Sequence, residues 1–189
     1  MLDRREFVRH LLIDRGDLLV VSGLGSATYD VAAAGDHPLN FYLWGAMGGT
    51  AMIGLGLALA QPDRRVAVLT GDGDMLMGLG SLATIGVKRP KNLTIVVLDN
   101  AHYGETGMQE SHTHAGIDLV AMALACRFRQ ARAVSRIEEA ANVRGLLHAE
   151  EGPSLVSARI GADDMPRVLP LRDGHAIKQR FIAALNGAS

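Results

Sequence analysis

The chain has 189 residues, the size of one domain. Its 19 basic and 20 acidic residues give a net charge of -1, which argues against a nucleic-acid or anionic-membrane partner. With one cysteine, Cys126, the chain cannot build an internal disulfide or a cysteine-ligated metal cluster. We therefore expect a cytoplasmic protein in which Cys126 is a buried, small apolar residue.

The predicted elements alternate between helices and short apolar strands. They are a helix at 1–12, a strand at 17–22, a helix at about 48–60, a strand at 65–70, a helix at 75–88, a strand at 93–98, a loop from 99 to about 115, a helix at 117–126, a short strand within 127–134, a helix at 135–149 with Ser135 as N-cap, a strand at 153–160 and a helix at 173–185. This alternation predicts one α/β domain over residues 1–189, with three α/β/α layers and a mainly parallel central sheet.

One uncharged stretch, residues 39–61, is long enough to span a bilayer. Its five glycines and the neighbouring Pro38 and Pro62 favour a loop followed by a buried helix instead. We therefore predict that the protein does not enter a membrane.

Two of the predicted strands end in residues that suit a metal site. The strand at 65–70 runs into Gly-Asp-Gly-Asp at 71–74, and the strand at 93–98 runs into Asp99 and Asn100. Because parallel strands carry ligands at their carboxyl ends, we expect Asp72 and Asn100 to meet at one edge of the sheet. A carboxylate and an amide oxygen suit Mg²⁺ when a diphosphate and water complete its coordination.

Gly-Asp-Gly, followed after a helix and a strand by an asparagine, resembles the cofactor signature of thiamine diphosphate-dependent enzymes. The resemblance covers nearly the whole chain and matches the diphosphate-binding domain of those enzymes. It implies that Asp72, the side-chain oxygen of Asn100 and the main-chain carbonyl of His102 bind Mg²⁺, with thiamine diphosphate as cofactor. The family pattern usually has Asn-Asn, whereas here Asp99 precedes Asn100.

The segment Trp44-Gly45-Ala46-Met47-Gly48 also resembles the glycine-rich stretch of that family. By this resemblance Met47 wedges between the two cofactor rings, while the Gly45 carbonyl and the Met47 amide bind the aminopyrimidine. The side chain of Asp74 is expected to turn away from the phosphates. The predicted cofactor-binding residues are Gly45, Ala46, Met47, Gly71, Asp72, Gly73, Asp74, Asn100, His102, Tyr103 and Gly104.

Within this family the sequence is most similar to sulfopyruvate and phosphonopyruvate decarboxylases. The resemblance implies the small subunit of a 2-oxo acid decarboxylase that acts on a small anionic substrate. It also implies a hetero-oligomer, in which a pyrimidine-binding (alpha) subunit supplies an activating glutamate. Candidate catalytic residues are Glu105, His112 and His114, on the loop where Met108 replaces an expected glycine.

Other functions stay open at this stage. The chain could be the thiamine diphosphate subunit of another carboligase or of a 2-oxoacid oxidoreductase, or a noncatalytic scaffold subunit. A dinucleotide-dependent oxidoreductase is disfavoured, because Gly23-Leu-Gly25 lacks the third glycine of that fingerprint.

Overall fold

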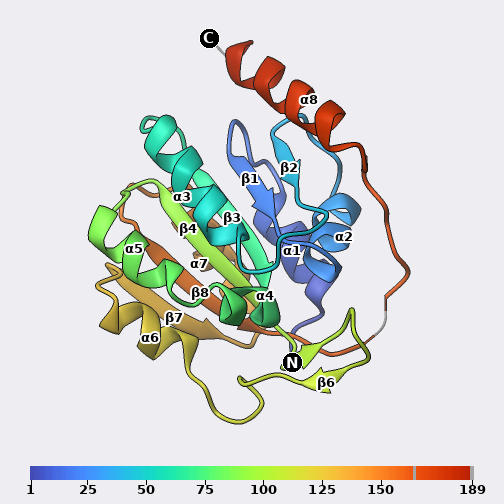
Figure 1. The fold of residues 1–189 in the computed structure, drawn as a ribbon, viewed down its shortest axis with the longest axis vertical. Helices are drawn as coiled ribbons and strands as arrows, with labels where there is room; N and C mark the ends of the chain where they lie inside the picture. Colours follow the sequence, from blue (N-terminus) through green and yellow to red (C-terminus); the bar gives the residue numbers. More distant parts are fainter. Residues whose placement is uncertain (164, 188–189) are drawn as a thin grey trace.

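The computed structural model describes residues 1–163 and 165–187, and in them six parallel strands form one sheet in the order β2-β1-β3-β4-β8-β7 (Figure 1). The strands are β1 (Leu19–Ser22), β2 (Asn40–Tyr42), β3 (Val66–Gly71), β4 (Leu93–Asp99), β7 (Gln130–Val134) and β8 (Ser154–Arg159). A small antiparallel hairpin of β5 (His102–Tyr103) and β6 (Gln109–Glu110) lies outside this sheet.

Helices cover both faces of the sheet. The core on one face includes residues of α1 (Arg4–Leu12), α2 (Ser26–Ala33) and α7 (Ala140–His148). The core on the other face includes residues of α3 (Thr50–Ala60), α4 (Asp72–Met77), α5 (Ser81–Lys88) and α6 (Leu119–Ala125), together with Phe181 of α8 (Gly174–Asn186). The predicted three-layer α/β/α fold with a parallel sheet is confirmed.

The central strands are apolar because they have no face toward water. All residues of β4, Leu-Thr-Ile-Val-Val-Leu-Asp, are buried, as expected for a parallel strand between two helical layers. The sheet also holds the start of the chain. Leu2 forms an isolated parallel bridge with Ile160, just beyond β8, and its amide donates to the carbonyl of Arg159 at 3.1 Å.

Several predicted boundaries were wrong. The helix predicted at 75–88 begins at Asp72 and is interrupted at 78–80, where Gly78 packs against the backbone of Gly48. A Cβ atom on Gly78 would lie 2.1 Å from the Gly48 carbonyl oxygen. Ser135 does not cap the helix as predicted. A 3₁₀ helix (Ile137–Glu139) precedes α7, and its N-cap is Arg136.

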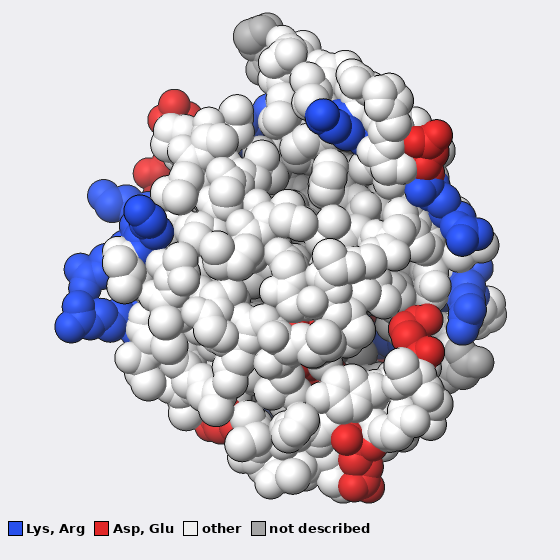
Figure 2. Space-filling view, in the orientation of Figure 1, with Lys and Arg blue, Asp and Glu red and all other residues white. Residues whose placement is uncertain are grey.

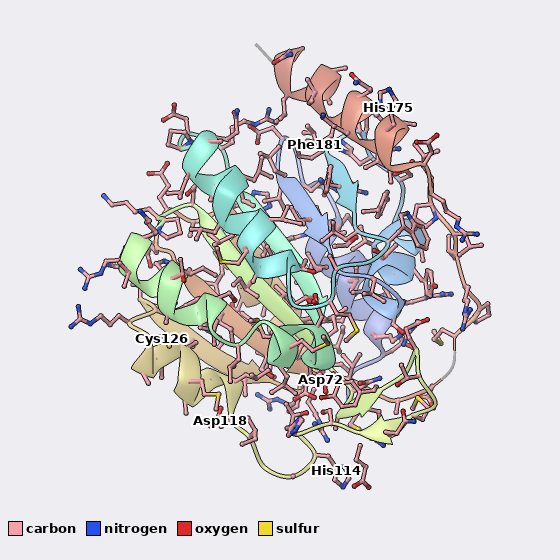
Figure 3. All side chains as sticks on the ribbon, viewed as in Figure 1. Asp72, His114, Asp118, Cys126, His175 and Phe181 are labelled. Atoms are coloured by element: carbon pink, nitrogen blue, oxygen red, sulfur yellow. The ribbon has the colours of Figure 1, made fainter. Side chains whose placement is uncertain are left out.

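Two short elements and one side chain also differ from expectation. The elements α2 and β2 were not predicted. Cys126, labelled in Figure 3, packs against the core as a small apolar residue, but it is partly buried and not fully buried as expected. The carbonyl of Cys126 approaches α5, where a Cβ atom on Gly86 would lie 1.6 Å from it.

The uncharged stretch at 39–61 forms β2, a loop and the 11-residue helix α3. Across residues 1–163 and 165–187, the helices are all too short or too polar to pass through a bilayer.

Candidate cofactor and metal site

Asp72 and Asn100 lie at the same edge of the sheet. Strands β3 and β4 pair in parallel, with Gly71 opposite Leu98, so the residues that follow them come together. Both line one cavity of about 90 Å³, which we call the site cavity. It is also lined by these predicted residues: Met47, Gly71, Gly73, Asp74, His102, Tyr103, Gly104 and Glu105. Gly45, Ala46, His112 and His114 do not line it.

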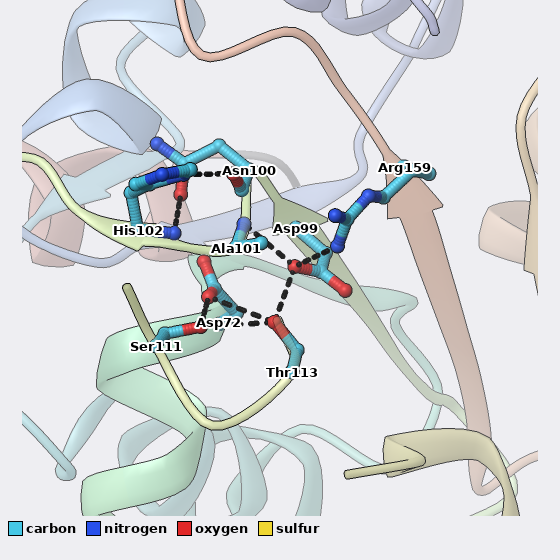
Figure 4. Close-up of polar contacts among 8 residues, drawn as sticks. All are labelled: Asp72, Asp99, Asn100, Ala101, His102, Ser111, Thr113 and Arg159. Carbon is cyan, nitrogen blue, oxygen red and sulfur yellow. Dashed lines mark hydrogen bonds and ion pairs between the residues drawn. The ribbon is translucent and has the colours of Figure 1, made fainter. Parts of the chain in front are cut away.

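The carboxylate of Asp72 is buried and receives two hydroxyl groups (Figure 4). Ser111 Oγ donates to its Oδ2 atom, and the single hydroxyl hydrogen of Thr113 is shared between that atom, 3.2 Å from Thr113 Oγ1, and Asp99. Burial raises the pKa of Asp72 above its ordinary 3.8, the charge of Asp99 raises it further, and the Ser111 hydroxyl opposes the rise. A divalent cation beside Asp72 would offset this cost of burying charge.

The turn after β4 is held by its own side chains (Figure 4). The amide of His102 donates to Asn100 Oδ1 at 3.0 Å. Asp99 Oδ1 accepts from the amide of Ala101 at 2.9 Å, from Thr113 Oγ1 at 2.8 Å and from Arg159 Nη1 at 3.2 Å. Asp99, which departs from the family pattern, therefore connects this turn to β8 and to the loop that reaches Asp72.

Asp74 holds the segment that precedes α3. Its Oδ1 atom accepts from the amide of Gly48, and its Oδ2 atom accepts from the hydroxyl groups of Thr50 and Thr70. The end of β1 leaves room for this cluster, since a Cβ atom on Gly23 would lie 2.7 Å from Asp74 Oδ2. The side chain of Asp74 is thus engaged by the protein itself.

Met47 projects from a tight turn. Ala46 and Gly48, on either side of it, have φ angles of 58° and 87°. Met47 is half-buried at the site cavity, and its Cε atom lies 3.8 Å from where Gly73 would carry a Cβ atom. The same Cβ atom would lie 2.7 Å from the Tyr103 ring. Glycine at position 73 therefore lets Met47 and Tyr103 approach the backbone after β3.

Of the three candidate catalytic residues, only Glu105 lines the cavity. The Glu105 Oε1 atom lies 2.7 Å from where Gly25 would carry a Cβ atom. His112 and His114 are exposed on the loop beyond β6, and Figure 3 labels His114. His112 Nδ1 is 3.1 Å from the hydroxyl of Tyr103, and His114 Nε2 is 3.2 Å from the carboxylate of Glu110.

The loop between β5 and β6 contains Met108, whose φ of 61° is a conformation that favours glycine. The replacement of the expected glycine at this position therefore carries backbone strain.

The cavity is also lined by residues that the sequence did not predict. These residues are Leu24, Ser26, Ala27, Asp30, Leu98, Thr106 and Ile160. Leu24 lies in the turn after β1, and Ser26, Ala27 and Asp30 belong to α2, which follows Gly25 at a φ of 74°. The sequence did contain a signal for these residues, because β1 is also followed by glycines, Gly23 and Gly25, at the same sheet edge as β3 and β4.

Asp30, one of these lining residues, is fully buried beside two arginines. It lies 3.0 Å from Arg4 Nε and 3.3 Å from Arg5 Nε. Burial raises the pKa of Asp30, and the two arginines oppose the rise. Because both counter-charges come from α1, the N-terminal helix is part of the support of the site.

The residues of the cavity fit a cation that is only partly held by protein. Asp72 and Asn100 offer hard oxygen ligands. In residues 1–163 and 165–187, no group of three His, Cys, Asp or Glu side chains could hold a metal by itself. Open space lies where Gly71 lacks a side chain, beside Asp72. A Mg²⁺ ion here would therefore need additional oxygens, as a bound diphosphate provides.

Comparison with known proteins agrees with this geometry. The family model of the thiamine pyrophosphate enzyme, C-terminal TPP binding domain, matches residues 23–158. The chain belongs to this family. It is 40% identical to sulfopyruvate decarboxylase subunit beta of Methanothermobacter thermautotrophicus over 100% of its own length and 98% of that protein.

Two further similarities extend the comparison. The chain is 39% identical over 82% of its length to phosphonopyruvate decarboxylase of Streptomyces viridochromogenes, of which it spans 40%. The thiamine diphosphate-dependent 4-hydroxybenzoylformate decarboxylase of Rhodococcus jostii RHA1 shares the fold, with a TM-score of 0.67 at 22% identity over 87% of this chain and 33% of that one. The predicted resemblance is confirmed, and the chain falls in the decarboxylase group of the family.

Proposed function

We propose that this chain is the small subunit of a thiamine diphosphate-dependent 2-oxo acid decarboxylase of the sulfopyruvate or phosphonopyruvate type. The observation that carries the proposal is the meeting of Asp72 and Asn100, from adjacent strand ends, in one cavity. The identity to a sulfopyruvate decarboxylase beta subunit over the whole chain supports the substrate class.

The metal and the diphosphate would be held at the sheet edge. In this proposal Asp72, the side-chain oxygen of Asn100 and the carbonyl of His102 bind Mg²⁺. The backbone amides of Gly73 and Asp74 would bind the diphosphate, and Ser26 also lines the cavity. When bound, thiamine diphosphate supplies the electron sink that makes loss of CO2 from a 2-oxo acid possible.

Residues of the chain would orient the rest of the cofactor and handle a proton. In the proposal Met47 would support the cofactor at the cavity, and the Gly45 carbonyl and the Met47 amide would hydrogen-bond its aminopyrimidine. Glu105, at the cavity, is our first candidate for proton transfer to the substrate. His112 and His114 stay secondary candidates, because their loop lies outside the cavity wall.

A partner chain completes the proposed enzyme. The phosphonopyruvate decarboxylase relative is a longer protein, of which this chain spans 40%. We infer that a separate pyrimidine-binding (alpha) subunit takes the place of the remainder. In the proposal it supplies the activating glutamate and forms a hetero-oligomer with this chain.

Calorimetric titration with Mg²⁺ and thiamine diphosphate tests the site. We expect the unmodified chain and Asp63→Asn, an exposed control, to bind, and Asp72→Asn to lose most of the affinity. Binding of NADH in place of thiamine diphosphate would contradict the proposal. With the partner present, sulfopyruvate and phosphonopyruvate should release CO2 without an electron acceptor. Turnover only with an acceptor would indicate a 2-oxoacid oxidoreductase.

A further inference from the structure

A second cavity, of about 200 Å³, adjoins the site cavity, and we call it the arginine cavity. The two cavities share part of their walls, because both are lined by Ser26, Asn100, Gly104 and Glu105. The residues that line only the arginine cavity include Arg4, Tyr29, Asp163 and Arg167. A small molecule bound at the shared wall can therefore extend from the site cavity toward two arginines.

Arg4, on α1, is a buried base with unused donors. Its side chain is 8% exposed, and its Nε atom lies 3.0 Å from the carboxylate of Asp30. Arg5 lies 3.3 Å from the same carboxylate, so two positive charges share one negative charge. The terminal nitrogens of Arg4 donate no hydrogen bond to any group in residues 1–163 and 165–187. A buried guanidinium in this state favours an anionic ligand beside it.

Arg167 brings a second guanidinium group from the segment between β8 and α8. Its Cζ atom lies 5.8 Å from the centre of the Tyr29 ring, which is a cation–π contact. Across the described parts of the chain, residues 1–163 and 165–187, Arg167 pairs with no carboxylate. Arg5 fastens this segment to α1 by donating to the carbonyl of Pro166. Figure 2 shows basic side chains along the right-hand side of the molecule, where Figure 1 has this segment.

The charges around the arginine cavity suit a ligand that is anionic at one end. A guanidinium group presents paired N–H donors that match the oxygens of a phosphonate or sulfonate group. Two carboxylates also line the cavity, those of Glu105 and Asp163. Glu105 lies in the shared wall, and Asp163 lies over its own turn, with Oδ2 2.8 Å from where Gly161 would carry a Cβ atom. A ligand with its anionic group at the arginines and its reacting carbon near Glu105 matches both signs of charge.

We propose that the arginine cavity binds the sulfonate or phosphonate group of the substrate, with Arg167 and Arg4 as the cations. This inference rests on the proposed function, which leaves the binding of that group unassigned. The substrate lies across the shared wall, with its 2-oxo group on the side of Asn100 and Glu105 and its anionic group on the side of α1. The two arginines therefore select a 2-oxo acid with a charged group on its third carbon over pyruvate.

Binding of analogues that do not react tests the cavity. They are 3-sulfopropionate and 3-phosphonopropionate, and propionate is the ligand that lacks the second anionic group. In calorimetric titration of the full chain, we expect one of the two analogues to bind at least about tenfold more tightly than propionate, and R167Q to remove this difference. The matched control is R172Q, because Arg172 lies 5.4 Å from the Trp44 ring and does not line the cavity. It should change the affinity less than about twofold.

The titration has two results that would overturn the proposal. One is equal affinity for propionate and for both analogues, and the other is an equal effect of R167Q and R172Q. Where the proposal holds, the analogue that binds more tightly identifies the anionic group as a sulfonate or a phosphonate.

Kinetics of the complete enzyme separates substrate binding from a structural role. The partner is the chain that restores 2-oxo acid decarboxylation to this one. We expect R167Q to raise KM at least about tenfold with kcat within about threefold, because the anionic group is held equally before and during the reaction. R167K keeps the charge and should return KM to within about threefold of the unmodified enzyme. A fall in kcat with an unchanged KM would overturn the proposal.

The two measurements also separate this inference from the proposed function. Binding of 3-sulfopropionate or 3-phosphonopropionate that depends on Arg167, in a complex that releases no CO2 from sulfopyruvate or phosphonopyruvate, supports the cavity and refutes the proposed function. Release of CO2 with the same KM for R167Q and R172Q supports the proposed function and overturns this inference.

Discussion

Removal of the Asp74 carboxylate should destabilise the free chain strongly. Three donors converge on it: the amide of Gly48 and the hydroxyl groups of Thr50 and Thr70. Asp74 is buried, so water does not replace the lost acceptor freely. In Asp74→Ala all three donors lose a partner, and the segment carrying Met47 loses its attachment to α4.

The magnitude follows from the number of donors. A hydrogen bond to a charged group contributes about 1.5–3 kcal/mol net. At the lower limit, three such bonds give a loss of about 4–5 kcal/mol, against a total stability of about 5–15 kcal/mol for a domain. Asp74→Asn keeps one acceptor oxygen but turns an amide N–H₂ group toward the other donors, so we expect a loss of about 2 kcal/mol.

Urea unfolding of the cofactor-free chain, followed by circular dichroism, measures these losses. The exposed control Asp63→Ala should stay within about 0.5 kcal/mol of the unmodified chain. In thermal unfolding, Asp74→Ala should melt roughly 8–20 °C lower, at about 2–4 °C for each kcal/mol. A loss below about 1 kcal/mol for Asp74→Ala would refute the view that its three hydrogen bonds hold the Met47 segment.

Three further outcomes are expected. Gly54→Ala should lower the free energy of unfolding by about 1–3 kcal/mol, because the added Cβ atom would overlap Val68. Gly56→Ala, on the outer side of α3, should raise the free energy of unfolding by about 0.5–1 kcal/mol. Equal effects of the two substitutions in urea unfolding would contradict this packing of α3. At a hundredfold excess over the Kd, Mg²⁺ with thiamine diphosphate should stabilise the unmodified chain by about 2.7 kcal/mol, and removal of the metal by EDTA, or Asp72→Asn, should abolish this gain in a melting experiment. Burial raises the pKa of Asp72 above its ordinary 3.8. In the metal-free chain, the stability contributed by protonated Asp72 is therefore full below about pH 3.8 and is lost as the pH rises through the folded-state pKa. Urea unfolding between pH 4 and 7 should show this decline in the unmodified chain, and a decline of the same size in Asp72→Asn would assign it to another group.

The strands that position the site were predictable because they are buried on both faces. Runs of β-branched residues indicated strands at 65–70 and 93–98, and the structure has β3 and β4 there. Strand β2 has three residues, too few for a periodic pattern. The interruption between α4 and α5 depends on the contact between Gly78 and the Gly48 carbonyl, which joins distant segments and leaves no local signal.

The same difference between local patterns and long-range contacts explains which site residues could be predicted. The strand-end rule brought Asp72 and Asn100 together, and the structure has them in one cavity. The hydroxyl groups of Ser111 and Thr113 reach Asp72 across a loop with no repeating pattern, so no spacing argument could find them. The role of Asp99 in connecting this loop to β8 was hidden for the same reason.

The bridge between Leu2 and Ile160 has a consequence for the order in which the sheet assembles. Ile160 follows β8, so Leu2 cannot pair until a segment far along the sequence is in place. Helix α1 needs no such delay, because both of its arginines reach Asp30 of the neighbouring helix α2. We therefore expect α1 to pack on α2 first and the bridge to close afterwards.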